Sequence, residues 1–289
     1  MSAHGEYYVP QPSHWPLVGS IGLTTTLMGA ALWLHDNWYG PYIFTLGFCI
    51  LIGMFFGWFG QVIYENQKGR YNLQVDRSFR WGMCWFIFSE ICFFGGFFGA
   101  LFMARYFIIP EMGGQTHPIT HQMLWPQFKA TWPLLVNPDN REFVGAYESM
   151  GAWGLAAINT LILLSSGVTI TWAHWALKLN KRRQLEIGLA CTIALGLLFL
   201  GLQAYEYTEA YKEMNLTLDS GIYGTTFFML TGFHGLHVTI GTIMLIVILL
   251  RSLYGHFTPA RHFAFEAVAW YWHFVDVVWL FLFIFVYWL

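Results

Sequence analysis

Seven long apolar segments, separated by short polar stretches, constrain the fold of this chain more than any other feature. A helix that crosses about 30 Å of hydrocarbon needs about 20 mostly apolar residues. Each segment reaches that length, so each is predicted to form one transmembrane helix. The segments cover about residues 16–35, 41–66, 80–107, 149–177, 185–209, 221–250 and 262–288.

The composition indicates the same class of protein. Of the 289 residues, 56% are hydrophobic and only 10% are charged, whereas soluble domains carry about 25% charged residues. The chain therefore lacks the charge to coat a water-facing surface. Its 15 tryptophans suit a protein with two membrane interfaces. A net charge of −2 provides no basic surface for nucleic acid. We therefore predict an integral membrane protein with no nucleic-acid partner.

Two stretches lie outside the apolar segments. Residues 1–15 form a polar arm without the basic region that begins a signal peptide. Residues 108–148, rich in Pro, Gln and Asn, exceed the usual length of a loop, which indicates a functional or partner-facing connection. The whole chain, residues 1–289, is predicted to be a single membrane domain.

The distribution of Lys and Arg predicts the orientation, because cytoplasmic loops carry an excess of both. With a cytoplasmic N-terminus, ten of them lie on the inner side: Lys68, Arg70, Arg77, Arg80, Lys178, Lys181, Arg182, Arg183, Arg251 and Arg261. The outer side then holds four: Arg105, Lys129, Arg141 and Lys212. The N-terminus is therefore predicted to be cytoplasmic and the C-terminus to lie outside.

Cysteines and glycines within the apolar segments predict packing only. The cysteines are far apart and never form a CxxC pair, which excludes a disulfide framework or a metal site. We expect them to be buried packing thiols; they are Cys49, Cys84, Cys92 and Cys191. Glycines spaced four apart allow helix backbones to approach closely; they are Gly53 and Gly57, and Gly95 and Gly99.

A lone carboxylate, Glu90, lies in the apolar stretch FIFSEICFFGG at residues 86–96. At 1.5 Å per residue it lies roughly 15 Å beyond Arg80, close to the bilayer midplane. An acid at that depth costs about 2.5–3.5 kcal/mol and normally faces protein, water or a specific partner. Glu90 could exchange protons or contact a partner, or it could donate one hydrogen bond to a neighbouring helix. Because burial disfavours the charged form, we expect it to be largely protonated at neutral pH.

Two further polar pairs lie near the middle of the sixth and seventh segments. His234 and His237 are three residues apart, as are His273 and Asp276, so each pair presents two polar groups on one helix face. Histidine is the commonest metal ligand, which suggests a metal or haem site. Hydrogen bonding between helices is the favoured alternative, because two histidines of one turn supply at most half of a metal's ligands.

Several polar and aromatic residues lie within a turn or two of the cytoplasmic helix ends. Arginine together with interfacial tryptophan suits phospholipid head groups. The alternative is ordinary positive flanking of membrane helices. The candidates for lipid binding are Trp58, Glu65, Arg80, Arg251 and His256.

Six stretches of the sequence resemble subunit III of the haem-copper cytochrome c oxidases of the aa3 type. GFHGLHV and WYWHFVDVVW are the most specific motifs within them. The resemblance covers the chain except residues 1–13 and about 108–148. The stretches are HWPLVGS (14–20), RWGMCWFIFSEICFFGGFF (80–98), SSGVTITWAHWAL (165–177), LQAYEY (202–207), YGTTFFMLTGFHGLHVTIG (223–241) and RHFAFEAVAWYWHFVDVVWLFLFIFVYWL (261–289).

The resemblance implies an all-α membrane fold of seven transmembrane helices. A two-helix part, residues 16–66, would splay from a five-helix bundle, residues 80–289, around a V-shaped cleft filled with phospholipids. Family members carry no haem and no copper, so haem a, haem a3 and copper are expected in partner subunits. The resemblance therefore assigns structural hydrogen bonding to the polar pairs His234/His237 and His273/Asp276.

Individual residues also match family positions. Trp58 and Glu65 match lipid-contacting residues of the second helix, Arg80 matches the basic start of the third, and Arg251 matches the arginine that ends the sixth. The carboxyl at the position of Glu90 faces the redox subunit, subunit I, and lies outside the main proton pathway.

The resemblance implies a non-redox core subunit III of cytochrome c oxidase. Its expected roles are to stabilise the catalytic subunit, sustain proton uptake and guide O2. Subunit I is the expected main contact, with subunit II and phospholipids as further partners and cytochrome c as electron donor to the complex. The long connection and the N-terminal arm favour a bacterial inner membrane over a mitochondrial one.

Two alternatives stay open. Subunit III of a quinol oxidase belongs to the same superfamily, but such subunits usually lack the first two helices, both of which are present here. A proton or ion translocator would use Glu90, His234, His237 and Asp276 directly.

Overall fold

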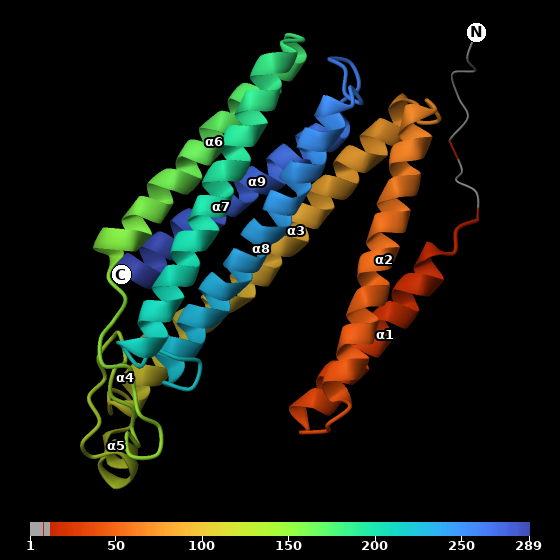
Figure 1. The fold of residues 1–289 in the computed structure, drawn as a ribbon. Coiled ribbons are helices and arrows are strands. Elements are labelled where there is room, and N and C mark those ends of the chain that lie inside the picture. The colour runs from red at the N-terminus through yellow and green to blue at the C-terminus, as the bar shows by residue number, and fades with distance from the viewer. Residues whose placement is uncertain (1–7, 9–11) are drawn as a thin grey trace. The chain divides into compact units, whose positions relative to one another are not determined.

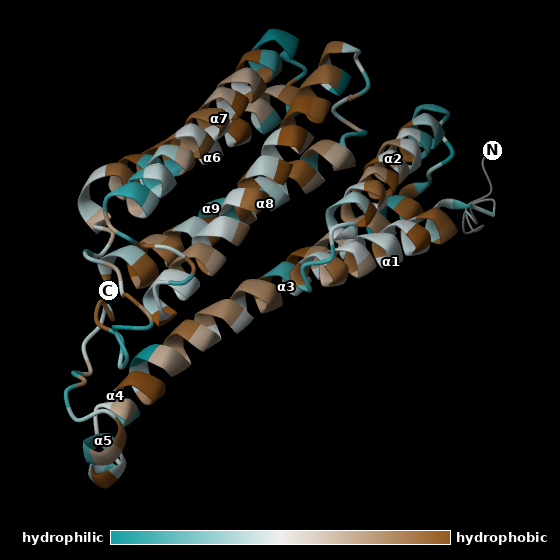
Figure 2. Cartoon of the chain, turned by 60° about the horizontal axis from the view of Figure 1, so that its bottom comes forward, coloured by the Kyte–Doolittle hydropathy of each residue, from teal (hydrophilic) through white to brown (hydrophobic). Residues whose placement is uncertain are grey.

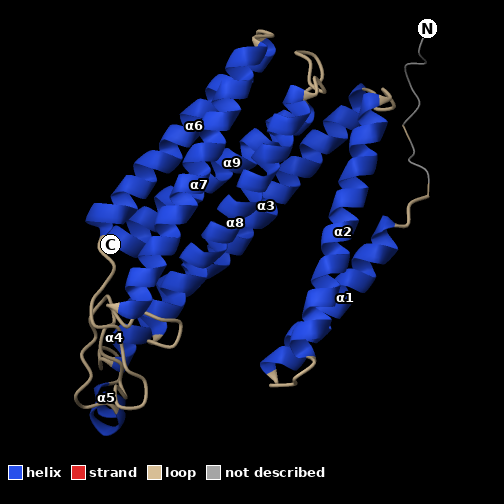
Figure 3. Ribbon diagram, viewed as in Figure 1, coloured by secondary structure: helices blue, strands red, loops and turns tan. Residues whose placement is uncertain are grey.

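The computed structural model describes residue 8 and residues 12–289, so most of the predicted arm over residues 1–15 lies outside the described part. The described chain is helical and its only β pairing is one isolated bridge between Thr258 and Arg261. Figure 3 shows the helices and the loops that join them. Seven of the described helices are long and apolar enough to cross a membrane, which confirms the predicted all-α fold with seven spans.

The observed helices follow the predicted segments closely. Short π-helical stretches, η1 (Ala104–Ile108), η2 (Ala152–Ala156) and η3 (Phe283–Trp288), extend three of them. The α-helices are α1 (Trp15–Leu34), α2 (Gly40–Gln67), α3 (Leu73–Met103), α4 (Ile109–Met112), α5 (Pro118–Leu124), α6 (Ala157–Lys178), α7 (Arg182–Lys212), α8 (Ile222–Leu253) and α9 (Phe263–Leu282).

The largest difference from the predicted bounds lies at the start of α3, which begins at Leu73 instead of residue 80. The side chain of Asn72 caps this end, since its Oδ1 accepts the backbone N–H of Val75 at 2.9 Å. One turn later Asp76 pairs with Arg80 at 2.8 Å. The predicted segment therefore marked where the continuous apolar run begins, whereas the helix itself begins about two turns earlier, in a mixed stretch of polar and apolar residues.

The chain divides into two compact units, residues 1–81 and residues 82–289, and the boundary falls within α3. Each unit is described separately below. The splayed arrangement and the lipid-filled cleft that the family resemblance implies stay predictions.

The first unit is built on a hairpin in which α1 and α2 lie side by side (Figure 1). Gly29 of α1 faces the backbone of Phe44, and Gly47 of α2 faces the backbone of Thr26. A Cβ atom at either glycine would collide with that backbone. Glycine at these two positions is therefore what allows the helices to approach so closely.

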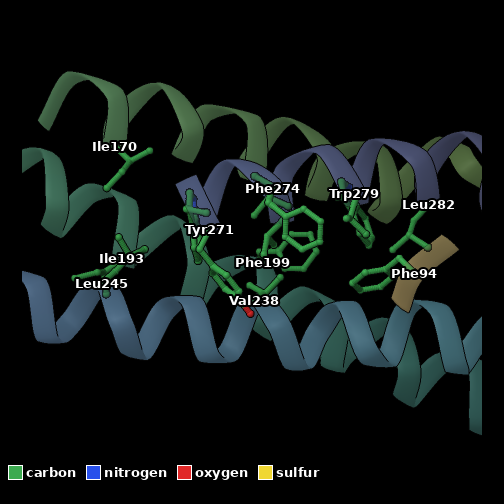
Figure 4. Packing of buried hydrophobic residues seen from close by; sticks show 14 of the residues in the cluster. Phe94, Ile170, Ile193, Phe199, Val238, Leu245, Tyr271, Phe274, Trp279 and Leu282 are labelled. Atoms are coloured by element: carbon green, nitrogen blue, oxygen red, sulfur yellow. The ribbon is translucent and has the colours of Figure 1, made fainter. Parts of the chain in front are cut away.

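In the second unit α6, α7, α8 and α9 form a ring in which each helix packs on the next and α9 returns to α6. Side chains of this ring and of α3 converge in one apolar core, part of which Figure 4 shows. Trp272 and Trp279 are fully buried there. Their indole N–H groups donate to Ser166 Oγ at 2.8 Å and to Thr160 Oγ1 at 2.9 Å. Two large aromatic side chains thus join α9 to α6 without leaving a buried donor unpaired.

The part of α3 that belongs to this unit packs on α8 and α9 through phenylalanines. The ring of Phe93 meets that of Phe233 edge-on at 5.0 Å, and Phe98 lies 6.2 Å from Phe281. Edge-to-face pairs of this kind stabilise a contact beyond the area they bury. They place the adjacent turn of α3, with Glu90, against α8.

The long connection over residues 108–148 contains α4 and α5 and is fastened to the connection between α7 and α8. Asn137 Nδ2 donates to the carbonyl oxygen of Ser220 at 3.2 Å. The backbone N–H of Tyr147 donates to the carbonyl oxygen of Met214 at 2.8 Å. These bonds join segments that are about 70 to 80 residues apart and hold the connection against the end of the bundle.

The outer faces of the membrane helices are largely apolar, and polar residues gather at helix ends and in loops (Figure 2). All four cysteines are free thiols, but they are exposed on these faces. The expectation that they are buried packing thiols was therefore wrong. The burial preference of cysteine reflects avoidance of water, and a face that meets hydrocarbon satisfies it equally well.

The predicted glycine pairs differ in what they contact. Gly57 lies against the ring of Trp15, so it does permit a close approach, whereas Gly53 has no neighbouring atom within 4 Å. Gly95 and Gly99 also have none within the described residues. The second pair therefore permits no close approach inside this chain and leaves a smooth outer face on α3.

Candidate functional site

The carboxyl of Glu90 has a partner within its own chain. Its Oε2 lies 2.8 Å from Nε2 of His237 on α8, a residue 147 positions away in the sequence. The other ring nitrogen of His237, Nδ1, lies 2.6 Å from the carbonyl oxygen of Phe233 and must donate to it. One proton is therefore shared between Oε2 and Nε2, and the pair is neutral overall whichever atom holds it.

The pair is shielded by aromatic rings. The ring of Phe94 lies 5.0 Å from that of His237, and the Tyr271 ring stacks on it at 6.3 Å. The Tyr271 hydroxyl also donates to the backbone carbonyl of His237 at 3.4 Å. A neutral pair within aromatic walls can lie in hydrocarbon without an unpaired charge. The protonated state expected for Glu90 and its contact with subunit I stay predictions.

The other predicted polar residues have separate partners. His234 is buried between Phe199 and Trp279, and its Nε2 donates to the carbonyl oxygen of Val275 at 3.2 Å. It therefore points toward α9, whereas His237 points toward α3. The two histidines do not converge on one point, so they do not offer a shared metal position.

His273 and Asp276 line a shallow groove between α6 and α9. Nδ1 of His273 lies 3.6 Å from Asp276 Oδ2, and Nε2 lies 3.2 Å from Thr171 Oγ1. The groove encloses about 660 Å³ and its other walls are apolar. This pair fixes one turn of α9 against α6.

At the end of the α1–α2 hairpin, Glu65 is the centre of a hydrogen-bond network. It accepts bonds from Tyr71 OH at 2.9 Å, from Tyr8 OH at 3.3 Å and from Gln61 Nε2 at 3.0 Å. Gln61 in turn accepts the indole N–H of Trp15 at 2.8 Å. Burial, followed by the hydrogen bond to the Glu65 carboxylate, raises the pKa of Tyr71 above its usual value. The network ties both helices to the segment that leads into α3.

The remaining candidates of the first unit are more exposed. Trp58 is 45% exposed and stacks on Phe59 with the ring centroids 5.7 Å apart. Arg80 is about one third exposed in its ion pair with Asp76. Both side chains are thus accessible from outside the chain, whereas Glu65 points into the protein.

The end of α8 holds a buried guanidinium group. Arg251 is 8% exposed and lies 4.5 Å above the ring of Phe257. Its Nε and Nη2 atoms make no hydrogen bond with the described residues. Arg182 secures the same turn by donating from Nη2 to the Phe257 carbonyl oxygen at 2.6 Å. The ring of His256 lies 6.0 Å from that of Tyr254. An anionic group would complete the hydrogen bonds of Arg251.

Two polar clusters were missed from the sequence. Glu206 is fully buried and accepts a hydrogen bond from Tyr287 OH at 3.2 Å. His174, His262 and Glu266 also lie together. Each cluster brings together residues of two helices that are far apart in sequence, so spacing gave no indication of the contact between the helices. Only the four-residue interval between His262 and Glu266 could have suggested a pair.

Comparisons with known proteins match this chain to one family over nearly its whole length. The family model described as cytochrome c oxidase subunit III matches residues 5–137 and 143–289. This match includes most of the 108–148 connection, which the motif resemblance did not cover.

Individual relatives match both compact units. Cytochrome c oxidase subunit 3 of Cyprinus carpio is 41% identical over 283 residues, which cover 98% of this chain and 96% of the relative. The subunit 3 of Drosophila melanogaster is 43% identical over 291 residues, covering 100% and 99%. That of Tachyglossus aculeatus aculeatus is 42% identical over 283 residues, covering 98% and 96%.

Proposed function

Since the chain belongs to the cytochrome c oxidase subunit III family, we propose that it is the non-redox core subunit of an aa3-type cytochrome c oxidase. The complex would reduce O2 to water with electrons from cytochrome c and pump protons. The observation that carries the proposal is the match over nearly the full chain, which includes all seven spans.

The redox centres of this complex, haem a, haem a3 and copper, would reside in partner subunits. Subunit I would be the main contact and subunit II a further one. The smooth face of α3 at Gly95 and Gly99 supports this, because small residues allow a partner helix to approach closely. Glu90, five residues before Gly95 on the same helix, is paired with His237 of this chain. The chain would stabilise subunit I, sustain its proton uptake and guide O2 toward it.

Phospholipids would bind at the inner ends of the helices. Arg251 supports this because two of its buried nitrogen atoms have no partner among the described residues, and a phosphate oxygen would accept their N–H groups. Trp58 and Arg80 in the first unit and His256 in the second would add contacts with phospholipid head groups. The network around Glu65 would hold the first two helices in place beside the lipid.

The chain is a multi-pass membrane protein. We place its N-terminus in the cytoplasm and its C-terminus in the periplasm of a bacterial inner membrane. The excess of Lys and Arg, ten against four, supports the orientation. The long connection and the N-terminal arm support the bacterial membrane.

Purification of the tagged chain tests the assignment. We expect haem a to accompany it, with the visible spectrum of an aa3 oxidase and oxidation of cytochrome c. A complex that contains haem but oxidises only quinol would support the quinol-oxidase alternative. If the isolated chain in liposomes conducts protons, and a Glu90→Gln variant does not, the translocator alternative would replace the proposal.

A double variant tests the lipid role. Arg251→Ala combined with Arg80→Ala should reduce bound phospholipid and shorten the period over which the oxidase turns over, with unchanged haem spectra. Arg141→Ala is the control, because its side chain is 99% exposed in the connection on the other side. Equal lipid content and lifetime in the double variant would contradict the role.

A further inference from the structure

Three potential metal ligands meet where the end of α6 faces the start of α9. His174 belongs to α6, Glu266 to the first turn of α9, and His262 is the residue that caps α9. One donor atom of each, the Nε2 atoms and a carboxylate oxygen, lies within 4.8 Å of the other two. All three residues belong to the second compact unit, and the cluster is separate from the Glu90–His237 pair.

Backbone contacts orient one of the imidazoles. Nδ1 of His262 lies 3.1 Å from the carbonyl oxygen of Thr258. Because a carbonyl only accepts, Nδ1 carries the hydrogen, and Nε2 is the nitrogen that faces Glu266. Histidines that bind metals are held in the same way, with the second nitrogen donating to a carbonyl or carboxylate. The loop that precedes α9 therefore presents His262 as a ligand.

The ligand atoms are close enough to share one positive species. Nε2 of His262 lies 3.0 Å from Glu266 Oε1, and Nε2 of His174 lies 3.7 Å from the same oxygen. Both Nε2 atoms are buried and have no hydrogen bond among the described residues. A proton on His262 could bridge two of these atoms, but Nε2 of His174 would stay 3.7 Å from the carboxylate oxygen, which is longer than a hydrogen bond. An ion would bridge all three ligand atoms.

The distances fit a small divalent ion. Ligand bonds of 2.0–2.2 Å in a tetrahedral site place the ligand atoms about 3.3–3.6 Å apart. The two separations, 3.0 and 3.7 Å, lie on either side of that range. We propose that His174, His262 and Glu266 form a binding site for a divalent transition-metal ion, with zinc the best match to two imidazoles and one carboxylate.

The surroundings allow an ion to enter while keeping the ligands ordered. The side chains of His174, His262 and Glu266 are 21%, 9% and 12% exposed. The ring of Phe265 lies 5.4 Å from that of His174 and covers one side of the cluster. Three protein ligands leave a fourth position for water or a partner's side chain. An ion here would clamp α6 to α9 at the predicted cytoplasmic surface.

Zinc counting tests the site. The tagged chain, purified with whatever subunits accompany it, would be stripped with a chelator and equilibrated with buffered zinc. Bound zinc would then be measured by mass spectrometry and compared with that of His174→Ala and Glu266→Gln variants. We expect one more tightly bound zinc in the wild type, and at least a ~10-fold loss of affinity in each variant. This count does not depend on oxidase activity.

His117→Ala is the matched control. His117 also pairs with a carboxylate, Glu111, at 3.0 Å, but it belongs to no group of three ligands among residue 8 and residues 12–289. Its loss should leave the zinc count unchanged. If the wild type and His174→Ala retain the same zinc, the cluster holds only a proton and the proposal is wrong.

A second measurement guards against misfolding of the variants. Zinc should raise the Tm of the wild-type protein, because a ligand that binds only the folded state stabilises it. It should not raise the Tm of Glu266→Gln, whose amide has the shape of the carboxylate without its charge. A Tm increase of equal size in both proteins would overturn the site.

Discussion

The α1–α2 hairpin and the α6–α9 ring hold their helices together by different kinds of contact. In the hairpin, glycines bring two backbones together and few side chains are buried. In the ring, large aromatic side chains fill the space between helices and donate their N–H groups to hydroxyls of α6. Lipid tails are as apolar as leucine, so burial of aliphatic surface alone holds neither region together. Close contact between backbones holds the hairpin together, whereas aromatic packing and hydrogen bonds hold the ring together.

The largest expected effect is on the hairpin. Gly29→Leu would place a side chain where the backbone of Phe44 lies, so α1 and α2 would separate at a cost of about 3 kcal/mol or more. The measurement is the amount of chain in membranes and its thermal unfolding in detergent. Gly53→Leu is the control, since a Cβ atom at Gly53 would meet no other segment of the described chain within 4 Å. Equal losses in both variants would show that close backbone approach is not the cause.

The ring should respond to the loss of one indole. Trp272→Phe removes buried volume and the hydrogen bond to Ser166, so unfolding should become easier by about 2–4 kcal/mol. Trp175→Phe on α6 is the control, because Trp175 is 62% exposed. Calorimetry of the two purified variants measures this difference in stability. A Trp272 variant as stable as the control would mean that the ring does not depend on its aromatic core.

Substitution of Glu90, where α3 contacts α8 of the ring, should lower the stability by a smaller amount. Glu90→Ala would leave Nε2 of His237 without its partner and cost about 1–3 kcal/mol, whereas Glu90→Gln can still donate a hydrogen bond and should cost less. Infrared difference spectra of the Gln variant should lack the C=O stretch of one protonated carboxyl. Spectra in which no such band is lost would show that Glu90 is ionised.

The smallest effect concerns the polar end of the hairpin. The pKa of Tyr71 is raised by burial and by its bond to Glu65. The folded state therefore holds this proton more tightly than the unfolded chain, in which tyrosine titrates near pH 10. Stability from this group is present below about pH 10 and lost as the pH rises further. Tyr71→Phe should weaken that alkaline decline; an unchanged decline would exclude Tyr71 as its source.

The contrast between the two regions also explains how much the sequence could predict. Runs of apolar residues predicted all seven spans, because hydrocarbon demands them wherever a helix crosses. Spacing of small residues predicted less. Gly53 and Gly57 share the favoured interval, yet the closest contacts between the backbones of α1 and α2 lie at Gly29 and Gly47. A glycine lets a neighbour approach, but its position alone does not say which face has one.

The partners of the candidate site residues could likewise not be predicted from the position of each residue in the sequence. Glu90 and His237 were each recognised as polar groups at membrane depth, but 147 residues separate them and no local pattern joins them. Likewise, His174 and Glu266 meet only because α6 and α9 are neighbours in the ring. Intrahelical intervals of three or four residues indicate shared faces. Pairing across helices depends on which faces meet, and that is decided by packing of the whole unit.

The fastening of residues 108–148 to the connection between α7 and α8 has a consequence for biosynthesis. The ribosome completes Asn137 about 80 residues before its acceptor, Ser220, exists. During that interval two further helices, α6 and α7, must be made, and Asn137 has no Ser220 carbonyl oxygen to donate to. The mature shape of the connection is thus a late event of assembly, and a chain that stalls before α8 would leave the connection without this attachment.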